Sequence, residues 1–186
     1  MKNGILNVIA IDPSKSRTGI YISQPGQSLS VRNKPTETQE GAVKNVFLYF
    51  QHLLSEKDID LGVMEAYSIN MKRPSGILAT PEIVGVIRLA FVIHGIPLVN
   101  VPAMTWKAMT IGMIQKQKKA SAAYLDMVRL KYGKDFPNTD EADAFMIYEA
   151  VRIMFAGGTR LTTAAQTVKD NISDAIERIR HGKKEV

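Results

Sequence analysis

Acidic residues stand at places in this sequence where a folding chain would ordinarily continue to bury apolar side chains. Asp12 follows the apolar run VIAI at 8–11, and Glu65 follows LGVM at 61–64. Asp140 and Asp143 lie at the start of a predicted helix in NTDEADAFMIYEA, one helical turn apart, so they share a face. Apolar residues continue that face, which is expected to pack on a sheet. Glu141 lies off the face and is expected to meet solvent.

Each of these residues, taken alone, also fits an ordinary structural role. An aspartate before Pro13 suits a turn, and a strand can simply end in a polar residue such as Glu65. Acidic residues after Asn138 or Thr139 suit a helix N-terminus, where they face the positive end of the helix dipole.

The four carboxylates together suggest metal chemistry. Two carboxylates on strands and two on a helix, aimed at one interior, would repel one another unless cations lay between them. Oxygen ligands without histidine or cysteine suit Mg²⁺ or Mn²⁺ rather than zinc. Two such ions about 4 Å apart can activate water and neutralise a leaving oxygen in phosphoryl displacement. The pattern therefore favours phosphodiester cleavage with two cations per site.

Positive charge is concentrated in one part of the chain. Lys and Arg number 24 against 18 Asp and Glu, which gives a net charge of +6. Between residues 102 and 132 only Asp126 opposes a basic group made of Lys107, Lys116, Lys118, Lys119, Arg129 and Lys131. A basic segment beside an acidic metal site is what a nuclease acting on a polyanion requires.

Composition excludes several classes of protein. The 186 residues are 45% apolar and 23% charged, as expected for one well-packed domain. There is no cysteine, which excludes a disulfide scaffold, a thiolate nucleophile and a cysteine zinc site, and fits a reducing compartment. We find no signal-peptide pattern and no apolar run of about 18 residues. We therefore expect a soluble, cytoplasmic protein without a membrane partner.

The hydrophobic pattern predicts an α/β protein. We expect strands at 5–11, 19–23, 28–33, 61–65 and within 95–102. We expect helices from about residue 38 to 54, at 81–94, around 106, at 120–132 and at 140–155. This order predicts a five-stranded mixed sheet, beginning with an antiparallel meander and flanked by helices.

The end of the chain is predicted to form one more helix. AGGTR at 156–160 is a helix stop, and apolar residues then recur in steps of four and three from Leu161 to Ile179. The seam is short and rich in alanine, so we expect it to pack on its own domain rather than in a coiled coil. We divide the chain into a catalytic domain at 1–156 and an amphipathic C-terminal helix with a basic tail at 157–186.

Several motifs in order suggest a family. They are IAIDPSKSRTGIYI at 9–22, VMEAYS at 63–68, EIVGVIRLA at 82–90, WKAMTIG at 106–112, KQKKAS at 116–121 and DEADAF at 140–145. Over roughly residues 6 to 155 the chain resembles the RuvC family of Holliday-junction resolvases, which have the ribonuclease H-like fold. One departure is Ser14, which stands where the family usually has a glycine in the first turn.

The resemblance implies an activity and a site. It implies that Asp12, Glu65, Asp140 and Asp143 bind Mg²⁺, for which Mn²⁺ can substitute. It also implies a homodimer that makes paired nicks in four-way DNA junctions and leaves 5′-phosphate and 3′-hydroxyl ends.

The resemblance further implies DNA contacts. Lys107 matches the family's lysine-bearing segment, near which Lys116 lies. For the second functional lysine, Lys118 fits without a gap and Lys119 fits the helix start better, so we take Lys119 as catalytic. Both are expected to contact DNA. The remaining expected DNA contacts are Lys15, Arg17, Tyr67, Lys72 and Arg73, although Lys72 and Arg73 equally suit an ordinary solvated loop.

Other functions fit parts of the same pattern. A ribonuclease H-like nuclease acting on flaps, forks or RNA hybrids would need the same carboxylates. A junction-binding protein without catalysis would need only the basic segment. A sugar-kinase or actin-like ATPase would share the early aspartate, but no glycine-rich phosphate loop follows the first strand.

Overall fold

The strands of the protein form one mixed sheet. The computed structural model describes residues 6–34, 36–67, 79–111, 121–157 and 160–182. Within these ranges the strands are β1 (Val8–Asp12), β2 (Arg17–Ile22), β3 (Gln27–Arg32), β4 (Leu61–Glu65) and β5 (Leu98–Val101). They lie in the order β3-β2-β1-β4-β5. The first three pair antiparallel, whereas β4 pairs parallel with both β1 and β5.

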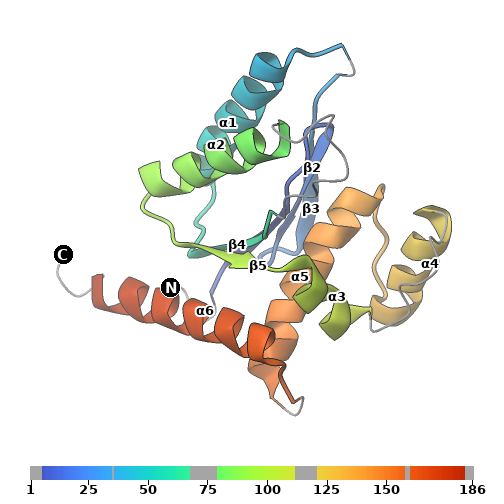
Figure 1. Cartoon of the computed structure of the whole chain (residues 1–186), viewed down its shortest axis with the longest axis vertical. Helices are drawn as coiled ribbons and strands as arrows, with labels where there is room; N and C mark the ends of the chain where they lie inside the picture. Colours follow the sequence, from blue (N-terminus) through green and yellow to red (C-terminus); the bar gives the residue numbers. More distant parts are fainter. Residues whose placement is uncertain (1–5, 35, 68–78, 112–120, 158–159, 183–186) are drawn as a thin grey trace.

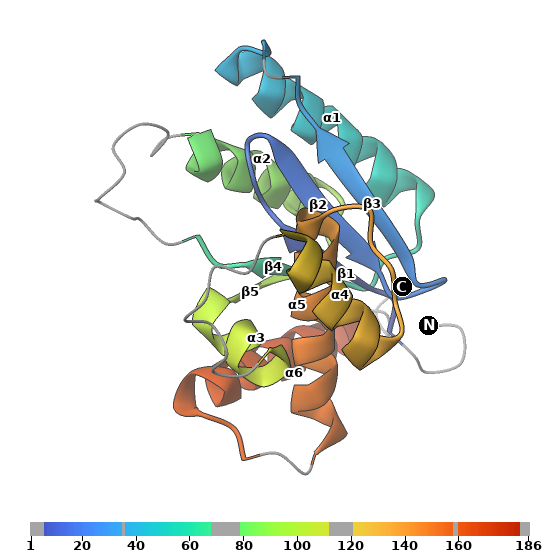
Figure 2. The same ribbon diagram turned by 90° about the vertical axis from the view of Figure 1, so that its right-hand side faces the viewer.

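Helices cover both faces of this sheet. They are α1 (Gln39–Glu56), α2 (Ala79–Ile93), α3 (Ala103–Thr110), α4 (Ser121–Tyr132), α5 (Thr139–Ala156) and α6 (Thr163–Gly182). Figures 1 and 2 show α1 and α2 side by side on one face, with α5 crossing the other. None of the helices in the described ranges is long and apolar enough to cross a lipid bilayer.

The predicted fold class is confirmed. The structure has the five-stranded mixed sheet, the opening meander and the flanking helices of a ribonuclease H-like fold. The element bounds differ from the predicted ones by a few residues. The largest difference is at β1, which begins at Val8 and extends through Asp12.

Side-chain alternation along the central strands divides the interior into two clusters. In β1, Val8 and Ala10 join a cluster with α5, whereas Ile9 and Ile11 join a cluster with α1 and α2. Alternate residues of a strand point to opposite faces of a sheet, so this division is the expected period of two. We call these the α5 cluster and the α1–α2 cluster.

The last helix is part of the α5 cluster. Ala165, Val168, Ile172 and Ala175 of α6 are buried in it, and α6 contacts α5 and β5. The seam therefore packs on its own chain, as its shortness predicted. Helix α6 lies beside the edge strand β5 (Figure 1).

We expect Ile172→Ala to lower the free energy of unfolding by about 2–4 kcal/mol, because it leaves a cavity under a side chain that is 1% exposed. Urea denaturation measures this loss. The matched control is Asn171→Ala, which changes an exposed residue of the same helix turn and should alter stability by about 0.5 kcal/mol or less. Equal stability of both variants would contradict the packing of α6.

Candidate active site

The first two carboxylates lie at one edge of the sheet and on one face of it. Strands β1 and β4 are neighbours and run parallel, so their final residues, Asp12 and Glu65, meet at the same edge. Asp12 follows Ala10 by two positions, and Glu65 follows Val63 by two. Ala10 and Val63 both belong to the α5 cluster, so strand alternation directs both carboxylates toward α5.

The turn after Asp12 is closed by a buried hydroxyl. Thr18 Oγ1 donates to the carbonyl oxygen of Ser14 at 3.0 Å and accepts from the Ser14 amide at 3.3 Å. The Asn33 side-chain amide donates to the carbonyl oxygen of Lys15 at 2.7 Å and ties the turn to the end of β3. These bonds fix the path of the chain immediately after the carboxylate, with a serine in place of the expected glycine.

Gly19 lets the start of α5 approach the sheet closely. It pairs with Asp12 across β1 and β2. A Cβ atom at this position would lie 1.9 Å from the carbonyl oxygen of Asp140, which no real contact permits. The absence of a side chain at Gly19 therefore allows Asp140 to lie directly beside the strand end that carries Asp12.

The N-terminus of α5 is held by a reciprocal cap. The side-chain oxygen of Asn138 accepts from the Glu141 amide at 3.0 Å, and its Nδ2 donates to Glu141 Oε1 at 2.8 Å. Ser30 Oγ on β3 also donates to Glu141 Oε1, at 2.9 Å. The prediction that Glu141 meets solvent is therefore wrong, because β3 extends alongside the helix start and covers a side chain that is 5% exposed.

Electrostatic coupling shows that the four carboxylates converge. The pKa of Asp12 is raised well above its usual value, first by burial and then by three negative charges. Those charges belong to Asp143, Glu65 and Asp140, in order of effect. Burial likewise raises the pKa of Asp143 to about 6, although a hydrogen bond from Tyr124 opposes the shift. The groups predicted from sequence thus lie together in a poorly solvated site.

Three of these carboxylates have a partner from the protein. Trp106 Nε1 donates to Glu65 Oε2 at 2.7 Å, and the Tyr124 hydroxyl donates to Asp143 Oδ1. Arg17 Nη1 lies 3.8 Å from Asp140 Oδ2. Within the described ranges, no three acidic, histidine or cysteine side chains already surround a single point as metal ligands would. The carboxylates are gathered, but they are turned toward these donors.

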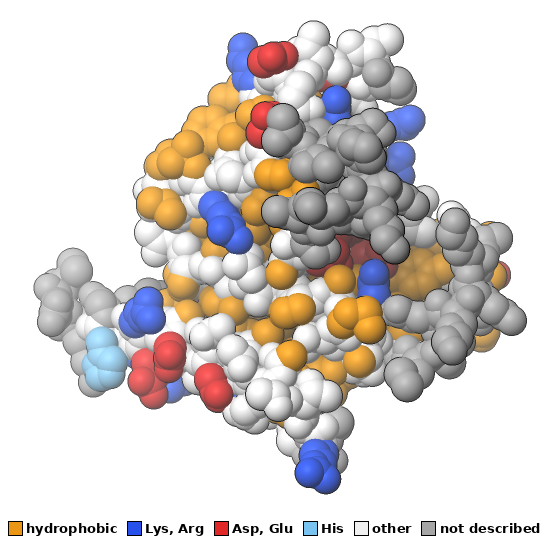
Figure 3. All heavy atoms as spheres, viewed as in Figure 1, with side chains coloured by type: hydrophobic (Ala, Val, Ile, Leu, Met, Phe, Trp, Pro, Cys, Tyr) orange, Lys and Arg blue, Asp and Glu red, His pale blue; other side chains and the backbone are white. Residues whose placement is uncertain are grey.

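One predicted lysine lies beside the acidic residues. Lys107 lowers the pKa of both Asp12 and Asp143 through its charge, although burial dominates both shifts. Its Nζ lies 4.9 Å from the centre of the Trp106 ring, as in a cation–π contact. A shallow hollow of about 260 Å³ next to it is lined by Trp106, Lys107, Tyr124 and Asp143 among others. Figure 3 shows acidic side chains reaching the surface near a basic one.

Comparison with solved structures identifies the fold. A structure of Thermus thermophilus RuvC in complex with a Holliday junction substrate matches with a TM-score of 0.64 and 17% identity. The match covers 83% of this chain and 98% of that one. A second structure of Thermus thermophilus RuvC matches over the same shares with a TM-score of 0.62. The chain has the RuvC fold. A scan against protein-family models gives no match, and neither does a search of curated proteins.

The likeness to RuvC extends over the strands and the helix that carry the acidic residues. At 17% identity the likeness concerns the backbone, so the chemistry has to be argued from the side chains themselves. Three residues of the site were not singled out from the sequence: Gly19, Tyr124 and Trp106, which contributes its indole N–H. Trp106 is fully buried next to Lys107.

The predicted DNA contacts occupy different surroundings. Lys15 is exposed in the turn after Asp12, and Arg17 pairs with Asp140. Tyr67 is half-buried and packs against the α1–α2 cluster. The remaining predicted contacts lie outside the described residues. These are Lys72, Arg73, Lys116, Lys118 and Lys119.

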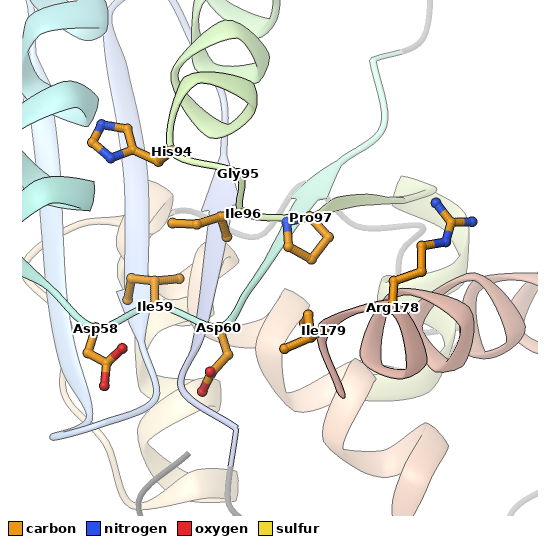
Figure 4. A pocket seen from close by; sticks show the side chains of 9 residues that line it. All are labelled: Asp58, Ile59, Asp60, His94, Gly95, Ile96, Pro97, Arg178 and Ile179. Carbon is orange, nitrogen blue, oxygen red and sulfur yellow. The ribbon is translucent and has the colours of Figure 1, made fainter. Parts of the chain in front are cut away.

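A second hollow lies away from Asp12, Glu65, Asp140 and Asp143. It measures about 590 Å³ and is lined by residues before β4, residues between α2 and β5, and the end of α6. Figure 4 shows that its charged side chains do not converge: Asp58 and Asp60 point away from Arg178, and the His94 ring is turned aside. Asp60 instead accepts from the Asn7 amide at 2.9 Å. We assign no ligand to this hollow.

The raised pKa values predict how stability depends on pH when divalent cations are chelated. The pKa of Asp143 rises from 3.8 to about 6 on folding, so the folded protein holds more protons than the unfolded chain in that range. The free energy of unfolding should therefore fall as pH rises from about 4 through about 6. Asp12→Asn should remove part of this slope and stabilise the protein at pH 7.5 by about 1–3 kcal/mol.

Thermal unfolding in EDTA between pH 4 and pH 8 measures both effects. The control is Asp58→Asn, an exposed aspartate at the other end of the sheet, which should leave the slope unchanged. A variant at Asp12 that is less stable than the unaltered protein at pH 7.5 would contradict the electrostatic argument.

Proposed function

We propose that this protein is a divalent-metal-dependent endonuclease that resolves four-way DNA junctions. The observation that carries the proposal is the convergence of Asp12, Glu65, Asp140 and Asp143 in one half-buried site of a RuvC fold. Burial and the charges of Asp143, Glu65 and Asp140 raise the pKa of Asp12, so its ionised form is costly to fold, and bound cations would offset that cost. The nearby Lys107 fits a polyanionic substrate.

The donor set fits Mg²⁺, and Mn²⁺ as its substitute. In our proposal Asp12, Glu65, Asp140 and Asp143 hold the cations, because all four offer the hard oxygen ligands that these ions prefer. When bound, two such ions supply a nucleophile from water and neutralise the leaving 3′-oxygen. The raised pKa of Asp12, and the absence of a side-chain hydrogen bond to it from any described residue, support this assignment. Asp12 is included among the residues that would hold the cations, since the other three carboxylates all act on its pKa.

The basic residues would hold the substrate. Lys107 lies close enough to Asp12 and Asp143 for its charge to act on both, so a phosphate held there would meet both the lysine and the cations. Arg17 pairs loosely with Asp140, and both side chains are more than a quarter exposed. We propose that Arg17 and Lys15 contact the DNA backbone next to the cut. We keep Lys119 as the second catalytic lysine, with Lys118 as its alternative.

We expect the protein with Mg²⁺ or Mn²⁺ to nick a synthetic four-way junction symmetrically in two strands of like polarity, leaving ends that a ligase seals. Asp12→Asn should abolish cleavage, a loss of at least about 10³-fold, because it removes a cation ligand. Junction binding should survive, because the basic residues remain. Strand-resolved gels and a mobility-shift assay measure the two effects.

The control for this experiment is Asp58→Asn, which makes the same chemical change far from the site. Flap, fork and RNA–DNA hybrid substrates belong in the same panel. Faster cutting of any of these would assign a different branched substrate. Tight junction binding without product under either metal would instead identify a non-catalytic junction-binding protein.

We further propose that the protein acts as a homodimer, because paired nicks in two strands require two sites. Helices α1 and α2 carry a surface of exposed apolar side chains: Leu48, Leu89, Val92 and Ile93 are 49–74% exposed. A groove of about 710 Å³ between the two helices adds Val43, Phe47 and Val86. Figure 3 shows this apolar surface at the upper left. It lies on the sheet face opposite the carboxylates, so a second copy bound there would leave both sites open.

We expect Leu89→Glu to convert the dimer into a monomer, because it places a charge in the centre of this apolar surface. Light scattering after gel filtration measures the mass. The control is Leu130→Glu on α4, which changes a leucine that is 87% exposed on a different helix. A dimer that survives Leu89→Glu would place the interface elsewhere.

A further inference from the structure

The indole N–H of Trp106 fixes one oxygen of Glu65. Trp106 lies on α3, is fully buried, and donates from Nε1 to Glu65 Oε2 at 2.7 Å. An indole nitrogen only donates, and a buried donor without a partner destabilises the folded protein. Burial fixes the position of the indole ring, and the hydrogen bond from this ring orients the Glu65 carboxylate.

Tyr124 holds Asp143 in the same manner from a different helix. Its hydroxyl, on α4, donates to Asp143 Oδ1, and its ring packs against the α5 cluster. Trp106 and Tyr124 thus reach the acidic residues from α3 and α4, the two helices that flank the hollow beside Asp143. Neither belongs to the acidic or basic groups that composition and charge pattern bring to notice.

Trp106 and Tyr124 donate from neutral groups, whereas Arg17 is positively charged. An arginine next to a carboxylate offsets its negative charge, as Arg17 does for Asp140. A neutral N–H or O–H orients a carboxylate and leaves its full charge in place. Each carboxylate has two oxygens, and the donor engages one of them, Oε2 in Glu65 and Oδ1 in Asp143. No described residue donates to the other oxygen of either carboxylate, which is therefore left for a cation.

We propose that Trp106 and Tyr124 are positioning residues that orient Glu65 and Asp143 for divalent-cation binding. The inference rests on the proposed function. Partners of metal ligands that hold their orientation contribute about 10–100-fold in metal affinity in other proteins. Removal of either donor leaves the carboxylate free to rotate, so cation affinity falls while the charge of the site stays the same.

The test is Mn²⁺ binding by the protein alone, measured by titration calorimetry. Tyr124→Phe removes one oxygen atom and keeps the ring, and Trp106→Phe keeps an aromatic ring while removing the N–H. Each substitution should raise the Kd for Mn²⁺ by about 10–100-fold. The matched control is Tyr148→Phe on α5, whose ring packs on Tyr21; it should leave the Kd unchanged.

A second readout separates positioning from a merely structural role. If the two residues orient ligands, junction cleavage by Tyr124→Phe should return to near the unaltered rate at saturating Mn²⁺. A structural defect would lower the rate at every metal concentration. Because Trp106 is fully buried, Tyr124→Phe carries the test where Trp106→Phe fails to fold.

The outcomes separate this inference from the proposed function. Wild-type Kd values in a folded Tyr124→Phe variant would overturn the positioning roles and leave the nuclease proposal standing. An unaltered protein that binds no Mn²⁺ would overturn both. An unaltered protein that binds Mn²⁺ but cuts no junction would overturn the nuclease proposal, while a weaker Kd in the variants would still support the positioning roles.

Discussion

Electrostatic repulsion around the half-buried carboxylate of Asp12 is the constraint on which the rest of this structure depends. Folding places Asp12 against Asp143, Glu65 and Asp140, and burial and these charges disfavour its ionised form. The surrounding fold has to supply enough rigid contacts to hold this arrangement. It does so from two directions, with parallel strands that end together and a capped helix brought close by Gly19. The two hydrophobic clusters on either side of the sheet anchor both.

The four carboxylates and the neighbouring Glu141 have different partners, and their electrostatic roles differ accordingly. Glu141 accepts two hydrogen bonds, from Ser30 and Asn138, and joins the start of α5 to β3. Asp140 faces the charge of Arg17. Among the described residues Glu65 and Asp143 accept from neutral donors, and the charge of Lys107 also acts on Asp143. Asp12 has no side-chain hydrogen bond from any described residue and the largest set of like charges around it. A cation would therefore gain most from Asp12, Glu65 and Asp143, and would compete with Arg17 for Asp140.

Much of the fold follows from local pattern, whereas the contacts within the site do not. Alternation in the strands and turn residues between them predicted the sheet, and parallel neighbours explain why Asp12 and Glu65 meet. Helical spacing alone predicted that Glu141 faces solvent. Periodicity describes a single helix and carries no information about β3, which runs alongside it. The same limit applies to Trp106 and Tyr124. A buried tryptophan must find an acceptor for its N–H, but only the folded chain shows that the acceptor is Glu65.

The need for a glycine at position 19 comes from a tertiary contact and not from the local sequence. In the sequence it is part of an ordinary turn-to-strand transition, and nothing local demands a glycine inside β2. In the fold, a single added carbon would meet the Asp140 carbonyl at 1.9 Å. The start of α5 would then have to move away from the end of β1, and Asp140 would move away from Asp12. The glycine at this position therefore allows Asp140 to join Asp12, a requirement that the spacing of the acidic residues in the sequence does not show.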